Sequence, residues 1–171
     1  ASDDFYYDLN GQQVQCSGGY YGLHREYNSD GQNISVTFLD KDGHAVCTSL
    51  GYAGVTYQRD GNGTVVGEQY FDTEWNPVKN SLGQYGELYQ RNEQGYIGQI
   101  TYLDADGNPT PTNAGFTILR RTYHRDGTAD TDMYFDANGN PKALSKGQYG
   151  IKRSGKVNLL LDRNGNNMLC V

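Results

Sequence analysis

Apolar and polar positions along this chain follow one pattern, in which two aromatic or aliphatic residues run into an aspartate every 32 residues. The segments leading to these pairs, such as 34–38, 65–71 and 96–102, are rich in the β-branched and aromatic residues that favour strands. A fixed period of this size predicts stacked copies of one supersecondary repeat. The five copies are Tyr6-Tyr7-Asp8, Phe38-Leu39-Asp40, Tyr70-Phe71-Asp72, Tyr102-Leu103-Asp104 and Tyr134-Phe135-Asp136.

Two turn signals divide each repeat. The first is Asp-x-(Asn/Asp)-Gly, as at 40–43, where the aspartate accepts backbone N–H bonds and the glycine takes the positive φ that closes a short hairpin. The third copy has Trp75 in place of that glycine, which predicts either another turn geometry or a strained one. The second signal follows a tyrosine, and it reads as a longer turn at 60–63 and 92–95 than at 30–31.

We therefore predict an all-β fold with two β-hairpins per repeat, stacked as a solenoid in a single domain over residues 1–171. Glycine at 23 positions opposes helices, and no stretch has a useful helical period. A closed barrel or propeller is the architectural alternative, because hairpin repeats can close on themselves. The chain starts almost inside a repeat, which indicates part of a longer protein. The repeats span about 6–37, 38–69, 70–101, 102–133 and 134–171, the last shortened as a C-terminal cap.

Composition narrows the partners. The formal net charge of -6 and the pI of about 4.9 argue against nucleic acid and anionic membrane surfaces. No long apolar run is present, so we expect no membrane insertion. Only 36% of residues are hydrophobic, which leaves little for a thick core. The 15 tyrosines offer a substitute, because each ring can be buried while its hydroxyl stays in water.

The three cysteines, Cys16, Cys47 and Cys170, show no Cys-x-x-Cys spacing, so zinc and redox motifs are absent. We predict free, mostly structural thiols. A disulfide between Cys16 and Cys47 of neighbouring repeats is the alternative, although their positions in the repeat differ by one residue.

The repeated Asp-x-Asp-Gly resembles the start of a calcium loop, but the third acidic position and the closing glutamate are missing. We predict turns without metal, and no cofactor. His44 and His124 stand at turn positions that suit polar, exposed residues, and His24 has no equivalent histidine in the other repeats. The chain contains no Gly-x-Ser-x-Gly, His-Glu-x-x-His or phosphate loop. The chain is therefore predicted not to be an enzyme. A glycosidase-like carboxylate pair is the remaining enzymatic alternative.

Aromatic residues beside glycines are the candidate binding residues. Tyr21, Tyr85 and Tyr149 share one repeat position, and each is followed by glycine, so small neighbours leave a ring face open to a sugar or a quaternary ammonium. The alternative is that the rings form the ladder joining one repeat to the next, a role that we assign to Phe71 and Phe135. The candidate ligand-binding set is Tyr20, Tyr21, Tyr52, Trp75, Tyr85, Phe116 and Tyr149.

The Tyr-Phe-Asp runs with Gly-Tyr segments between them resemble the cell-wall-binding (choline- or glucan-binding) repeats of Gram-positive surface proteins and clostridial toxins. They are also similar to the tyrosine-aspartate repeats of large secreted polymorphic proteins. The cell-wall family stacks β-hairpins and captures choline or glucan between aromatics of successive hairpins. This chain has a longer period, and only Trp75 where that family repeats tryptophan. The resemblance implies a bacterial surface or secreted location.

Together these observations predict a non-enzymatic module that binds cell-wall polymer or another glycan through exposed tyrosines and anchors a larger bacterial protein. The alternative is a structural spacer, or an array that binds another protein, in which every ring serves the core. An exposed row of rings at repeat spacing would favour the first, and wholly buried rings would favour the second.

Overall fold

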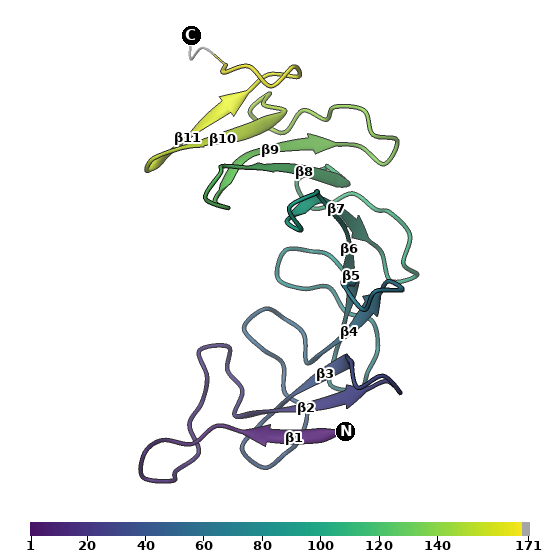
Figure 1. Cartoon of the computed structure of the whole chain (residues 1–171), viewed down its shortest axis with the longest axis vertical. Coiled ribbons are helices and arrows are strands. Elements are labelled where there is room, and N and C mark those ends of the chain that lie inside the picture. The colour runs from purple at the N-terminus through teal and green to yellow at the C-terminus, as the bar shows by residue number, and fades with distance from the viewer. Residues whose placement is uncertain (169–171) are drawn as a thin grey trace. The chain divides into compact units, whose positions relative to one another are not determined.

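The computed structural model describes residues 1–168, and these form eleven β-strands and no helix (Figure 1). The predicted all-β, hairpin-rich fold is therefore confirmed. The strands are β1 (Ser2–Phe5), β2 (Gly22–Tyr27), β3 (Asn33–Leu39), β4 (Gly54–Arg59), β5 (Val65–Phe71), β6 (Gly86–Arg91), β7 (Ile97–Leu103), β8 (Ile118–Tyr123), β9 (Ala129–Phe135), β10 (Gly150–Ser154) and β11 (Val157–Leu161).

The chain divides into two compact units, Ala1–Gly86 and Glu87–Val171, called here the N-terminal and C-terminal units. In the N-terminal unit, strands β1 to β5 lie in chain order, and each pairs antiparallel with the next. In the C-terminal unit, β7 to β11 follow the same rule. Neighbours in sequence are thus neighbours in the sheet, as a hairpin repeat requires.

One turn geometry recurs along residues 1–168. At Asp40 the backbone N–H donates to the carbonyl of His44 at 2.8 Å, and Gly43 N–H donates back to the Asp40 carbonyl at 3.2 Å. The Asp40 carboxylate accepts N–H bonds from Asp42 and His44, both at 2.9 Å. This is a three-residue hairpin loop closed by a left-handed residue, and it accounts for the aspartate without an ion. In nine further turns the side-chain oxygen of the first residue accepts the same two backbone N–H bonds; these residues are Asp8, Asn28, Asp60, Asp72, Asn80, Asn92, Asp104, Asp136 and Asp162.

Each full repeat holds three such turns, and the prediction of two was incomplete. The glycine between the two predicted turns closes a turn of its own: Gly51 N–H donates to the Thr48 carbonyl at 3.0 Å, and Thr48 N–H to Tyr52 at 2.9 Å. Cysteine, threonine or leucine begins most of these turns, so the sequence signal of a leading aspartate is missing.

The predicted extra length of two second turns is wrong. All four begin 32 residues apart, at Asn28, Asp60, Asn92 and His124, and each has glycine at its fourth position. Tyrosine does not mark the start of every copy of this turn. A tyrosine directly precedes the first and last of these turns, whereas arginine does so in the other two.

An aromatic ladder runs along one face of the strands in each unit. In the N-terminal unit, successive ring centroids lie 6.1, 4.8, 5.9 and 4.6 Å apart, and the rings pack against buried Leu23, Val36 and Val55. In the C-terminal unit the spacings are 5.6 and 4.7 Å, beside buried Leu119. The rings of the ladder are Tyr6, Tyr20, Phe38, Tyr52 and Tyr70, and then Tyr102, Phe116 and Tyr134.

Phe71 and Phe135, which we assigned to the ladder from the sequence, lie outside it. Phe71 stacks on Trp75, and the guanidinium carbon of Arg120 lies 4.3 Å from the centroid of Phe135. Side chains alternate between the faces of a strand, so the ladder takes the first member of each aromatic pair and the second points away.

We predict that Tyr52→Ala costs up to about 3 kcal/mol of unfolding free energy, the lower end of the range for deleting a core aromatic ring, because Tyr52 is half-buried. Tyr52 contacts both Phe38 and Tyr70 in the ladder. The control is Tyr21→Ala, because Tyr21 lies outside the ladder and the equivalent residue of the next repeat is Ala53. Urea unfolding followed by circular dichroism measures both, and equal losses would contradict the ladder as the source of stability.

Candidate functional site

The predicted binding residues separate into two groups. Tyr20, Tyr52 and Phe116 are half-buried members of the aromatic ladder, so their main contacts are other rings. An apolar cavity of about 380 Å³ opens beside Tyr20, where Ser49 N–H bridges two neighbouring loops by donating to the Gly18 carbonyl at 2.9 Å.

The remaining four lie outside the ladder. Tyr21, Tyr85 and Tyr149 are half-buried at one shared repeat position, and Lys79 Nζ is 5.6 Å from the Tyr85 ring centroid. Trp75 is the only tryptophan in the chain, and 41% of its surface is exposed, more than any other member of the set.

Trp75 has a left-handed backbone, with φ of 66°. Its turn is otherwise ordinary: Trp75 N–H donates to the Asp72 carbonyl at 3.1 Å, and the Asp72 carboxylate accepts from Glu74 and Asn76 N–H, both at 2.9 Å. The prediction of a strained residue in an unchanged turn is confirmed. For a non-glycine residue this conformation costs roughly 1–2 kcal/mol.

Two contacts hold the indole ring against the sheet. Phe71 stacks on it with centroids 5.0 Å apart and the ring planes 8° from parallel. A Cβ at Gly54 would lie 2.2 Å from Cζ3 of Trp75, so the ring fills the space that a side chain on β4 would otherwise take. Gly54 is therefore required by the position of the ring.

A cavity of about 280 Å³, called here the Trp75 pocket, lies beside this ring. Strand register explains the arrangement: Thr37 on β3 pairs with His24 on β2 and with Gly54 on β4. His24 and Thr37 therefore lie side by side on β2 and β3, and the Trp75 ring, which covers Gly54 on β4, lies next to Thr37. The pocket is lined by His24, Glu26, Ser35, Thr37 and Trp75.

The polar groups of the Trp75 pocket are oriented by hydrogen bonds. His24 Nδ1 lies 2.5 Å from Asp3 Oδ1, and Ser35 Oγ donates to Glu26 Oε2 at 3.1 Å. Fixed donors and acceptors beside an open ring suit a ligand with both an apolar face and hydroxyl groups. Within residues 1–168, no group of three or more His, Cys, Asp or Glu side chains could hold a metal ion.

His24 was predicted to have no functional role, and neither Glu26 nor Thr37 was predicted as a site residue. His24 and Glu26 lie on β2 and Thr37 lies on β3, so the pairing register of these two strands brings them together. The one available signal was Trp75, whose departure from glycine marked the turn that completes the pocket.

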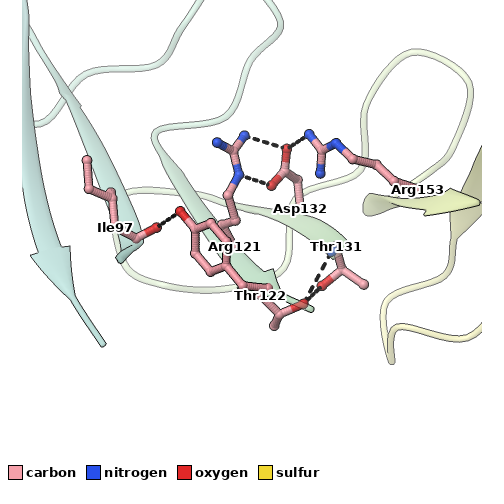
Figure 2. Close-up of polar contacts among 7 residues, drawn as sticks. Ile97, Arg121, Thr122, Thr131, Asp132 and Arg153 are labelled. Atoms are coloured by element: carbon pink, nitrogen blue, oxygen red, sulfur yellow. Dashed lines mark hydrogen bonds and ion pairs between the residues drawn. The ribbon is translucent and has the colours of Figure 1, made fainter. Parts of the chain in front are cut away.

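A second polar cluster in the C-terminal unit joins β8, β9 and β10 (Figure 2). Asp132 is 3% exposed, and Arg121 donates to it through Nε at 2.6 Å and Nη2 at 2.8 Å. Arg153 Nη2 donates to the same carboxylate at 2.7 Å. Burial alone would raise the pKa of Asp132, but the hydrogen bonds and charges of both arginines outweigh it and lower the pKa.

Cys16 is a half-buried free thiol and Cys47 an exposed one, whereas Cys170 lies outside the described residues. Among residues 1–168 there is no helix of the length and apolar character needed to cross a bilayer.

No family model matches the chain, and no curated protein matches it either. The resemblance of its repeats to cell-wall-binding repeats therefore stays a prediction.

We predict that Gly54→Ala displaces the Trp75 ring, because the new methyl group would overlap Cζ3. Trp75 is the sole tryptophan, so its fluorescence emission reports the change directly and should shift toward that of a hydrated indole. Gly61→Ala is the control, since a Cβ there meets nothing within 4 Å. Unchanged emission in Gly54→Ala would contradict the described seat of the ring.

A pH prediction follows from Asp132. Its pKa is lowered in the folded state, so its stabilisation is present above the unfolded value of about 3.9 and is lost as pH falls through the folded pKa. Asp132→Asn leaves Arg121 and Arg153, both half-buried, without their counter-charge. Removing one partner of a fully buried pair typically costs about 3–5 kcal/mol, and the loss at neutral pH should fall below that range because water reaches both arginines. Urea unfolding at a series of pH values should show the variant losing less stability on acidification.

Acid sensitivity should not vanish in Asp132→Asn. Backbone N–H bonds also lower the pKa of the turn carboxylates Asp40, Asp72, Asp136 and Asp162. An acid response identical to that of the parent chain would contradict the charged assignment of Asp132.

Proposed function

We propose that the chain is a non-enzymatic glycan-binding module. Its architecture in this proposal is a solenoid of about five 32-residue repeats with a shortened C-terminal repeat. Its role is to attach a larger bacterial surface or secreted protein to cell-wall polymer or another glycan. The observation that carries the proposal is the left-handed Trp75, with its ring presented to a polar pocket.

The strain at Trp75 supports a binding role. Glycine occupies the equivalent position in the other four repeats and forms the same turn, so the turn itself has no need of a ring. Strained residues that persist in a well-determined structure cluster at ligand sites. Trp75, the residue with the strained backbone, thus also lines the Trp75 pocket.

The chemistry of the pocket supports a sugar. Phe71 covers one face of the indole, and the exposed remainder offers a flat apolar surface against which the C–H face of a sugar ring can pack. His24, Glu26 and Thr37 place a ring nitrogen, a carboxylate and a hydroxyl within the same cavity. Sugar hydroxyls donate and accept hydrogen bonds, so they match this mixture.

Repetition supports binding to a polymer. Tyr21, Tyr85 and Tyr149 stand at one repeat position, and their rings are only half-buried. We propose that they add weak contacts along an extended glycan, where several sites on one chain raise the overall affinity. The resemblance to cell-wall-binding repeats supports the same class of ligand and the surface location.

One observation favours the spacer or protein-interaction alternative. Tyr20, Tyr52 and Phe116, three of the candidate rings, lie in the aromatic ladder and contribute to packing. If every ring had this role, the repeats would be a scaffold without a small ligand.

The test uses Trp75→Gly, which restores the residue found in the equivalent turns and removes the strain together with the ring. The variant should fold. We expect its affinity for short soluble glucan or peptidoglycan oligosaccharides to fall about tenfold or more, as for loss of a stacking contact worth 1–3 kcal/mol. Isothermal titration calorimetry measures this, with choline chloride as a separate ligand.

The triple variant Tyr21→Ala, Tyr85→Ala, Tyr149→Ala separates the two kinds of contact. It should bind short oligosaccharides like the parent chain and be retained less on insoluble cell-wall polymer. Unchanged affinity in Trp75→Gly would remove the Trp75 pocket as the site. A parent chain that binds no saccharide at all would favour the spacer.

A further inference from the structure

A different cavity, of about 460 Å³, lies in the C-terminal unit, and residues of the turns 92–96 and 124–128 line it together. This cavity is called here the basic pocket. Apart from its two tyrosines, the ionisable side chains that line it are all basic: Arg121, His124 and Arg125. No aspartate or glutamate lines it, although the chain as a whole carries a net charge of -6. The residues that carry the inference are Gln94, Tyr96, Arg121, Tyr123, His124 and Arg125.

Two tyrosines form an aromatic wall in this pocket. The rings of Tyr96 and Tyr123 lie 4.9 Å apart at 33°. Tyr123 Oη donates to the Ile97 carbonyl at 2.7 Å, a bond that fixes its ring (Figure 2). The hydroxyl of Tyr96 lies against Gly127 so closely that a Cβ there would be 2.7 Å from it. Tyr96 nevertheless remains 40% exposed, so part of its surface is open to a ligand.

The basic groups differ in how far they are already engaged. Arg121 uses Nε and Nη2 on Asp132, which positions the guanidinium and leaves Nη1 as its remaining nitrogen. His124 Nε2 lies 3.5 Å from Asp130. Arg125 is exposed, and no ion pair forms at its side chain within the part of the chain that the structure describes.

Two of the acidic residues nearby have partners outside the lining, whereas Asp130 lies 3.5 Å from His124, which is part of the lining. Asp132 is buried between Arg121 and Arg153, and Asp126 accepts hydrogen bonds from the backbone and hydroxyl of Thr128. The lining itself carries no carboxylate, so a ligand in the basic pocket meets Arg125 without a competing ion pair among the described residues.

This combination occurs at one position of a repeated scaffold. His124-Arg125 corresponds to Asn28-Ser29, Asp60-Gly61 and Asn92-Glu93 in the other second turns. Tyr96 likewise corresponds to Gln32, Thr64 and Thr128. The shared turn geometry needs neither a cation nor a ring at these places, because the other repeats form it without them. The basic and aromatic side chains at these positions are thus not needed to form the turns.

We propose that the basic pocket binds an acidic saccharide. The sugar ring packs against Tyr96 and Tyr123, and its oxyanion receives hydrogen bonds from Arg125 and from Nη1 of Arg121. Charge-assisted bonds from arginine to a carboxylate or sulfate are the strong ones available here. Gln94 adds a neutral donor and acceptor. The inference rests on the proposed glycan-binding function and adds a second subsite, which selects for charge.

The test uses the full chain and two probes, a uronic-acid trisaccharide and its methyl ester, which lacks the negative charge and carries one added methyl group on each carboxyl. A sulfated trisaccharide distinguishes sulfate from carboxylate as the preferred oxyanion. We expect the acid to bind about tenfold more tightly than the ester, since a hydrogen bond to a charged group is typically worth that factor or more. Its affinity should fall as salt rises.

Arg125→Gln should lower the affinity for the acid about tenfold and leave the ester unchanged. Arg125→Lys should restore part of the loss. The matched control is Arg163→Gln, because Arg163 is an exposed arginine at the same position of another turn, the one that begins at Asp162. Neither substitution touches the Asp132 cluster, so both proteins should fold.

Equal binding of acid and ester, or an Arg125→Gln variant that binds the acid like the parent chain, would overturn the proposal. A parallel titration with a neutral oligosaccharide measures glycan binding that does not depend on charge. It therefore separates a failure of the basic-pocket proposal from a failure of the proposed glycan-binding function. Loss of acid selectivity with neutral binding intact counts against the basic pocket alone. Acid binding without neutral binding supports the basic pocket and counts against the Trp75 pocket.

Discussion

The structure depends on one interaction, the side-chain oxygen of aspartate or asparagine that accepts two backbone N–H bonds inside a three-residue turn. Each such turn reverses the chain at a fixed position, and a fixed reversal sets the register of the strands on both sides. Register then decides which face each side chain occupies. The 32-residue spacing of the turns places one ring in line with the next, and the aromatic ladder follows from that alignment. Local turns and contacts between neighbouring rings therefore both contribute to the stability of this fold.

A scaffold fixed by repetition makes its departures informative. Most positions are explained by the turn or by the ladder, and the same explanation covers every copy. Trp75 is not explained in this way, because glycine forms the same turn with less strain in the other repeats. Arg125 and Tyr96 are not explained either, because their counterparts are small or polar and the turns are unchanged. These departures lie at cavities, with Trp75 in the N-terminal unit and Arg125 and Tyr96 in the C-terminal unit.

The sequence was sufficient for what is local. Asp-x-(Asn/Asp)-Gly predicted the hairpin turns. The tryptophan in place of glycine predicted either another turn geometry or strain at Trp75, and the structure shows the strain. Features that depend on register were missed or misplaced. Phe71 was assigned to the ladder, but the pleat of the strand directs its side chain to the other face. The turn closed by Gly51 was not predicted, because it begins with threonine and not with aspartate. His24 and Thr37 meet only because β2 pairs with β3. Asp132 reads as one more carboxylate until Arg121 and Arg153, from two other strands, are seen to surround it.

The central claim is that binding resides where the repeat is broken and not at every copy of it. Proton–nitrogen NMR spectra of the labelled chain, recorded with increasing amounts of a short neutral cell-wall oligosaccharide, test this most directly. The account predicts that the indole N–H of Trp75 and the amides of His24, Glu26, Ser35 and Thr37 shift first and furthest. Shifts of similar size at the corresponding residues of every repeat, or an indole signal that does not move while others do, would contradict it.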